Sequence, residues 1–199
     1  MSSIPAPLEP EELLNIFLSR HEYSREQLTK VGVLTMAWAV FEHELELTLW
    51  EMGAPVVSGA IPATDRLTPT QRIDEFTKLA QPLLDPNWLP SIEAFAEIAK
   101  KVAEYRNAIA HGYPAGVSFG ALSRANFSWV GELRRKPPKT GKVDDQTLDV
   151  MLGALNVLIQ ALYRGRGCDG VLGVMAITAY AFQSEALHAI RALNVSGTP

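Results

Sequence analysis

Three polar residues in the middle of the chain combine groups that can bind an anion and move a proton. Arg106, Asn107 and His111 lie in residues 92–114, where apolar side chains recur at helical spacing. A guanidinium donates two parallel hydrogen bonds to a phosphate or carboxylate, an amide both donates and accepts, and an imidazole exchanges its proton near neutral pH. This combination indicates acid–base chemistry on a bound anion.

Arg106 occupies a position that the helical spacing would assign to an apolar residue. It falls between Val102 and Ile109 on the face that also carries Phe95 and Ala99. A guanidinium there costs desolvation free energy unless it is paired or opens onto a wet pocket. The face therefore predicts either an internal partner or a bound ligand for this side chain.

His111 ends the same predicted helix, where the helix dipole favours the imidazolium by roughly 0.3–1 kcal/mol. Residues five apart differ by about 140° around a helix and about 7.5 Å along it. Arg106 and His111 can therefore meet on one ligand only through the reach of the arginine, the end of the helix at Gly112, or a second subunit. A structural alternative also fits the periodicity: Arg106 pairs with Glu42, and His111 caps the helix.

Helical periodicity dominates the rest of the chain and predicts an all-α bundle of four to six helices. Ser24 is expected to cap the first long helix. Thr68 and Gln71, with Pro69 between them, have the spacing of a capping box that starts the next one, and Leu83 is expected on its buried face. The predicted helices span about residues 11–20, 24–52, 68–83, 89–111, 145–164 and 171–193.

A short β-ribbon or loop insertion is expected after the third long helix. Residues 117–119 and 126–130 are rich in β-branched and aromatic side chains, and glycines separate these runs. The predicted organisation is an N-terminal segment with a short helix at 1–23, a helical bundle at 24–165 with the insertion at about 115–143, and a C-terminal helix at 166–199 that packs on the bundle.

Composition excludes several classes of protein. The 199 residues are 47% hydrophobic and 20% charged, which suits a chain with a buried core. The longest apolar stretch, residues 170–182, is shorter than the roughly 20 residues of a membrane helix, and the N-terminus lacks a secretory-signal pattern. The lone cysteine, Cys168, excludes a disulfide framework within the chain and a multi-cysteine zinc site. We therefore expect a soluble, cytoplasmic protein without a membrane partner.

Two short motifs resemble cofactor and metal sites, but each lacks an essential part. Residues 165–170 have the glycine spacing of a dinucleotide-binding loop, but a predicted helix precedes them where a strand is required. His43 and Glu44 begin a zinc-protease motif, and Leu47 stands where its second histidine would be. We expect neither a cofactor nor a metal.

Charge is distributed unevenly along the chain. The net charge is −4, yet residues 120–142 contain six lysines and arginines and one glutamate. A basic segment on an acidic body is typical of a phosphate-backbone contact or of a solvated loop. The candidate contacts to an RNA backbone are Arg124, Arg134, Arg135, Lys136 and Lys139.

The sequence Arg106-Asn107-x-x-x-His111 resembles the R-x4-6-H signature of HEPN domains, in which the residue after the arginine is usually polar and often asparagine. The first long helix, with its aromatic residues and Glu42, is similar to the first core helix of bacterial HEPN proteins. The resemblance covers roughly residues 31–162 and is one of pattern rather than of close sequence identity.

The resemblance implies a helical bundle that dimerises and cleaves RNA without a metal. A ribose 2′-OH would attack the adjacent phosphate and leave a 2′,3′-cyclic phosphate. In that chemistry His111 moves the proton, Arg106 holds the nonbridging oxygens, and Asn107 orients the phosphate or the histidine. Two copies of the motif would face each other across the dimer cleft, and such proteins act as toxins or phage-defence effectors.

Tyr113 extends the motif to the R-x4-H-x-Y form found in HEPN toxins whose antitoxin adenylylates the tyrosine. The resemblance thus adds an antitoxin protein to RNA and a second copy as expected partners. Packing of Tyr113 near the helix end is the simpler interpretation. Two alternatives to a ribonuclease remain: a non-catalytic HEPN-like module that binds RNA, a nucleotide or a protein, and a helical homodimer in which Arg106 is a buried salt-bridge residue.

Overall fold

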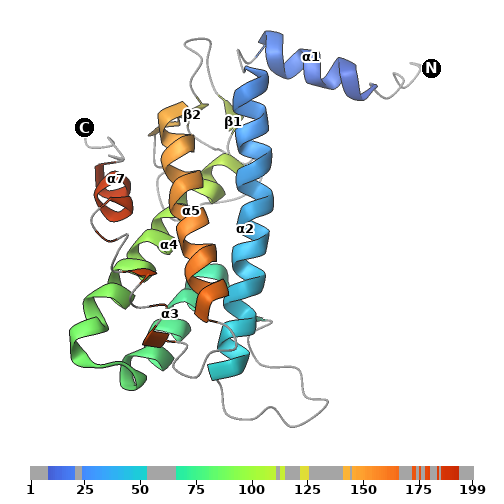
Figure 1. Ribbon diagram of the computed structural model, residues 1–199. Coiled ribbons are helices and arrows are strands. Elements are labelled where there is room, and N and C mark those ends of the chain that lie inside the picture. Colours follow the sequence, from blue (N-terminus) through green and yellow to red (C-terminus); the bar gives the residue numbers. More distant parts are fainter. Residues whose placement is uncertain are drawn as a thin grey trace.

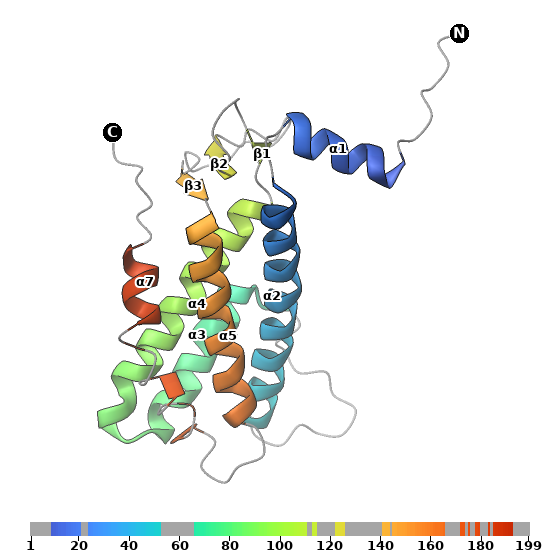
Figure 2. The same ribbon diagram turned by 45° about the horizontal axis from the view of Figure 1, so that its top comes forward.

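Helices form most of the structure (Figures 1 and 2). The computed structural model describes residues 9–20, 24–52, 66–110, 113–114, 122–125, 141–143, 145–165, 172, 173, 175, 178, 179, 183 and 185–192. The α-helices in this part of the chain are α1 (Pro10–Arg20), α2 (Arg25–Met52), α3 (Pro69–Ala80), α4 (Leu89–Ala110), α5 (Asp145–Gly165) and α7 (Ala186–Ala192). Two 3₁₀ turns, η2 (Gln81–Leu83) and η3 (Pro86–Trp88), join α3 to α4.

Four of these helices, α2 to α5, surround the core. The longest, α2, packs against α5 and α3, while α4 packs against α3 and α5, and α7 covers part of α4 and α5. Helix α1 projects from the start of α2, away from the rest of the bundle (Figures 1 and 2). The prediction of an all-α helical bundle is confirmed.

The helix starts that the sequence predicts at Ser24 and Thr68 are both present. The Ser24 hydroxyl accepts a hydrogen bond from the backbone N–H of Gln27, and the Gln27 side chain accepts one from the N–H of Ser24, each 3.0 Å long. Thr68 and Gln71 form the same reciprocal box at the start of α3, with Pro69 in the first turn. Both boxes satisfy backbone donors that a helix N-terminus leaves open.

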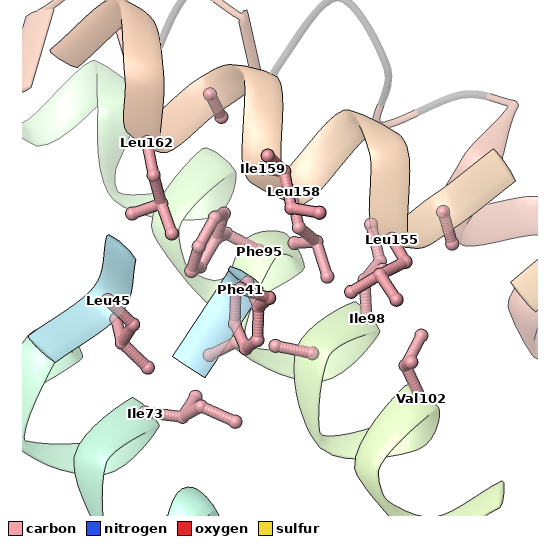
Figure 3. Packing of buried hydrophobic residues seen from close by; sticks show 14 of the residues in the cluster. Phe41, Leu45, Ile73, Phe95, Ile98, Val102, Leu155, Leu158, Ile159 and Leu162 are labelled. Carbon is pink, nitrogen blue, oxygen red and sulfur yellow. The ribbon is translucent and has the colours of Figure 1, made fainter. Parts of the chain in front are cut away.

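The core is a continuous apolar cluster with aromatic rings at its centre (Figure 3). The rings of Phe41 and Phe95, from α2 and α4, have centroids 6.3 Å apart, and Phe76 of α3 lies 5.2 Å from Phe95. Trp38 extends the row, with its centroid 5.1 Å from that of Phe41. Leu155 and Leu158 of α5 close the cluster from the opposite side. This packing fixes α4, the helix that carries Arg106.

The predicted helix 68–83 is wrong in its last turn. α3 ends at Ala80, and Leu83, expected to be buried, is 63% exposed. Pro82 has no N–H to donate to the carbonyl four residues before it, so the chain tightens into a 3₁₀ turn there. Leu83 is therefore carried away from the buried face.

The single helix predicted over residues 171–193 is also wrong. Glu185 lies in a turn, and its carbonyl accepts a hydrogen bond from the N–H of Ala189, so α7 starts anew. Core residues lie on both sides of this break, including Met175 before it and Leu187 after it. Periodicity along a single helix axis does not reveal such a break.

The insertion contains a small antiparallel sheet at the end of the bundle where α2 begins and α4 ends (Figure 2). It has three short strands in the order β1 (Tyr113–Pro114), β2 (Leu122–Ala125) and β3 (Gly141–Val143). The expected runs at 117–119 and 126–130 lie outside the described residues. The sequence predicted a β-ribbon or loop insertion here, and the strands described in it pair residues 113–114 with 124–125 and residues 122–124 with 141–143.

Candidate functional site

Arg106 lies in the last two turns of α4, on the face that the helix turns toward the core. Phe95, Ala99 and Val102 on this face are buried, and Ile109, the next residue along it, is packed against the core. Arg106 falls between Val102 and Ile109 and is half-buried. Its Nε atom is fully buried and has no hydrogen-bond partner among the described residues. The desolvation expected for this position is thus present in the fold.

The guanidinium of Arg106 is satisfied in part by its neighbour in sequence. Its Nη1 donates a 3.1 Å hydrogen bond to Oδ1 of Asn107, whose side chain is exposed. An amide oxygen is neutral, so this contact orients the guanidinium without cancelling its charge. Within the described part of the chain, Arg106 therefore has a neutral hydrogen-bond partner at the border between the core and solvent.

Glu42, the alternative partner, makes no ion pair or hydrogen bond with Arg106, although both residues are described. Glu42 is half-buried on α2, at the edge of the buried stripe of that helix. The ion pairs that do join helices nearby use other carboxylates, such as Glu46, whose Oε2 lies 3.7 Å from Nη1 of Arg72. Glu42 therefore does not form the salt bridge that the structural alternative requires for Arg106.

The remaining residues of the motif surround the end of α4. His111 follows Ala110, the last residue of the helix, and lies outside the described residues. Tyr113 begins β1 and pairs with Ala125, while its side chain lies outside the described part. Helix α4 thus ends at Ala110 and the sheet begins at Tyr113, which ties the segment after Arg106 to β2.

The small sheet brings the two ends of the basic segment to this same place. Arg124 of β2 pairs with Pro114 of β1 and with Gly141 of β3, and the next pair along is Ser123 with Lys142. β2 also packs against α4. Of the predicted backbone contacts, the main chain of Arg124 is described. The side chain of Arg124 and all of Arg134, Arg135, Lys136 and Lys139 lie outside the described residues.

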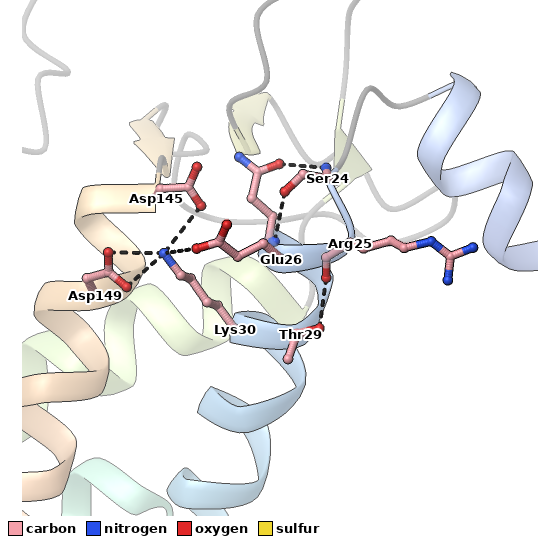
Figure 4. A network of polar contacts seen from close by, with 8 residues as sticks. Ser24, Arg25, Glu26, Thr29, Lys30, Asp145 and Asp149 are labelled. Atoms are coloured by element: carbon pink, nitrogen blue, oxygen red, sulfur yellow. Dashed lines mark hydrogen bonds and ion pairs between the residues drawn. The ribbon is translucent and has the colours of Figure 1, made fainter.

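A second cation near this end of the bundle has a different environment (Figure 4). The Nζ of Lys30 on α2 lies 2.9 Å from Oδ1 of Asp149 and 3.6 Å from Oδ1 of Asp145, both on α5, and 3.2 Å from Oε1 of Glu26. The hydrogen bond with Asp149 raises the pKa of Lys30 above its ordinary value, and Glu26 adds to the effect. This cluster joins the first turns of α2 and α5, and the i,i+4 spacing of Glu26 and Lys30 was its one sequence signal.

Comparison of the chain with protein-family models, curated proteins and solved structures finds no match. Within the described residues, no group of three or more His, Cys, Asp or Glu side chains could hold a metal ion. Among the helices of that same part of the chain, none combines the length and the apolar character that crossing a membrane requires.

The described geometry supplies an anion-binding element. Arg106 presents a charged, planar donor beside an amide that can both donate and accept, and carboxylates do not neutralise it among the described residues. A half-buried guanidinium of this kind binds a phosphate more strongly than an exposed one, because less water screens the charge.

Proposed function

We propose that this protein is a metal-independent endoribonuclease of the HEPN type. The observation that carries the proposal is the guanidinium of Arg106, held in the core-facing row of α4 with its Nε buried and an amide as its hydrogen-bond partner. The desolvation of such a group is compensated when a phosphate binds. The resemblance of the Arg106–His111 segment to the HEPN signature selects RNA among phosphate-bearing ligands.

In the proposed reaction the 2′-oxygen of a ribose forms a bond to the adjacent phosphorus while the bond from phosphorus to the 5′-oxygen breaks. The 2′-OH loses its proton, and the leaving 5′-oxygen gains one, with His111 moving the proton. Arg106 holds the nonbridging oxygens as negative charge develops on them, and Asn107 orients the guanidinium by the observed hydrogen bond. The products are a 2′,3′-cyclic phosphate and a free 5′-OH.

The proposed biological role is that of a toxin or phage-defence effector in the cytoplasm, with RNA, a second copy of the chain and an antitoxin protein as partners. Contact with the RNA backbone is assigned to Arg124, Arg134, Arg135, Lys136 and Lys139. The pairing of Arg124 with the strand that follows His111 supports this assignment, because it ties the start of the basic segment to the end of α4.

The test compares four purified full-length chains, the wild type and three variants, and their effects on growth when they are expressed. The wild type should degrade RNA and leave 2′,3′-cyclic phosphate ends, also in the presence of a chelator. Arg106→Ala and His111→Ala should each lower the rate at least about a hundredfold, the loss expected when a group that stabilises the transition state is removed. Arg164→Ala, which removes an exposed arginine at the end of α5, is the matched control and should cleave like the wild type.

Intact RNA and equal growth with the wild type and both variants would overturn the proposal. Equal cleavage by all of them would also overturn it, because the activity would then not depend on these residues. RNA or nucleotide binding by the wild type without cleavage would instead favour the non-catalytic HEPN-like module.

A further inference from the structure

The Lys30 cluster, which consists of Lys30, Glu26, Asp145 and Asp149, lies where α5 follows the small sheet (Figure 4). Asp145 is the first residue of α5, and β3 ends at Val143, two residues earlier. An ammonium on α2 therefore contacts the first turn of the helix that continues from the edge strand of the sheet. The cluster is placed to fix that junction.

The sheet is small and spans the ends of two helices. Its strands have two, four and three residues, and β3 lies at one edge, paired with β2. β3 packs against α5, and β2 packs against α4. Strands this short form few ladder hydrogen bonds, so a sheet of them depends on the helices that it packs against. The place of β3 therefore depends on the start of α5.

The start of α5 is held to α2 at two successive turns. The Nζ of Lys30 donates a 3.0 Å hydrogen bond to Oδ2 of Asp149 and lies 3.6 Å from Oδ1 of Asp145, one turn earlier. The side chain of Lys30 is 16% exposed, whereas those of the two aspartates are more than half exposed. The first turn of a helix lacks backbone partners for its N–H groups and frays readily. A cation of low exposure that contacts both turns opposes this fraying.

The same sheet holds the backbone around the candidate site. Tyr113, three residues beyond the end of α4, pairs with Ala125, and the main chain of Arg124 lies between Pro114 and Gly141. A displacement of β3 would thus pass through β2 to β1, and it would move the segment that follows Arg106. The start of the basic segment would move with it.

We infer that Lys30 is a positioning residue: by holding the first turns of α5 to α2, it keeps the small sheet, and the segment between α4 and β1, in place. The effect on the sheet is a property of the fold alone, whereas the effect on cleavage rests on the proposed function. Lys30 itself touches neither RNA nor the reacting atoms.

The first experiment follows hydrogen exchange of the full-length chain by mass spectrometry, without RNA. In Lys30→Met, peptides that cover β2, β3 and the first turn of α5 should exchange about tenfold faster than in the wild type. Peptides from α3, which packs on the other helices away from the sheet, should exchange at the wild-type rate. Lys30→Arg, which can keep the ion pairs, should restore the slow exchange.

Two further variants separate the role of the junction from the loss of any ion pair. Asp149→Asn breaks the hydrogen bond of the cluster at an exposed residue, and it should speed exchange of the sheet about threefold. Arg191→Met is the matched control. It breaks the ion pair of Arg191 on α7 with Glu97 on α4, about 20 Å along the helix axis from the end of α4, and it should leave the sheet unchanged.

The second experiment measures RNA cleavage by the same chains. Lys30→Met should lower kcat about tenfold, the loss expected when a reacting group is misplaced, and should leave KM within about twofold, because Arg106 and Asn107 remain. Lys30→Arg should have the wild-type kcat. Cleavage of RNA by Lys30→Met at the wild-type kcat, with a loosened sheet, would overturn the positioning role.

Exchange separates this inference from the proposed function. A loosened sheet in Lys30→Met, together with a wild type that does not cleave RNA, would overturn the proposed function and confirm that Lys30 holds the sheet. Equal exchange of the sheet in Lys30→Met and the wild type would overturn the inference. A wild-type sheet that is unprotected from the start, or an equal gain in exchange in α3 and the sheet, would also overturn it.

Discussion

Two cations near one end of the bundle have opposite electrostatic environments. Lys30 is in contact with three carboxylates, from Glu26, Asp145 and Asp149, and its side chain is 16% exposed. Within the described part of the chain, Arg106 has a neutral amide as its hydrogen-bond partner and a buried Nε without a partner. One positive charge is thus balanced within the chain, and the other is not balanced among the described residues.

This difference distinguishes a cation that stabilises the fold from one that can bind a ligand. Lys30 joins the start of α2 to the start of α5, and an added anion would have to compete with the carboxylates that already surround the ammonium. At Arg106 a phosphate would meet no such competitor among the described residues, and the guanidinium could donate two parallel hydrogen bonds to it. Variants that exchange or remove each cation therefore test whether the difference is functional.

The largest expected effect comes from exchanging the type of cation at each position. Arg106→Lys keeps the charge but replaces two parallel donors with a single ammonium, so the RNA cleavage rate should fall about a hundredfold. Lys30→Arg, the matched exchange, should leave the rate unchanged. The rates are measured on a labelled RNA, and circular dichroism checks that both variants fold. Equal losses in the two variants would remove the distinction between the cations.

A smaller effect, of opposite sign at the two positions, is expected on stability. Lys30→Met leaves three carboxylates crowded without their cation, so it should lower the free energy of unfolding. Arg106→Met removes a buried donor that lacks a partner and should raise the free energy of unfolding by about 1 kcal/mol. Urea unfolding followed by circular dichroism measures both. If Arg106→Met proves the more destabilising of the two, Arg106 is a structural residue.

The features that the sequence predicted are those determined over a few residues. The predicted N-cap at Ser24 and the predicted capping box at Thr68 both form, because a hydroxyl at a helix start lies close to the backbone N–H three residues later. The place of Arg106 on the buried face of α4 follows from spacing alone in the same way. Local geometry was sufficient for these elements and for the all-α class.

The features that the sequence did not predict depend on packing between distant segments. Lys30 meets Asp149 only because α2 and α5 lie side by side. Glu44 is buried although it carries a carboxylate, and it lies on a helix that α3 also covers.

The smallest effect concerns a third cation, Arg191 of α7, which donates hydrogen bonds of 2.8 and 2.6 Å to the Glu97 carboxylate on α4. The hydrogen bonds from Arg191 hold the pKa of Glu97 below its ordinary value of 4.5. A carboxylate whose pKa is lower in the folded state stabilises the protein above its unfolded pKa, and this stabilisation is lost as the pH falls through the folded value. Urea unfolding of the wild type should therefore show a small loss of stability on acidification, of the kind that exposed pairs give. Glu97→Gln should reduce this loss, and Arg106→Met should not change it, because no described carboxylate pairs with Arg106. If Arg106→Met also reduces the loss, a carboxylate does balance Arg106, and the contrast between the two cations fails.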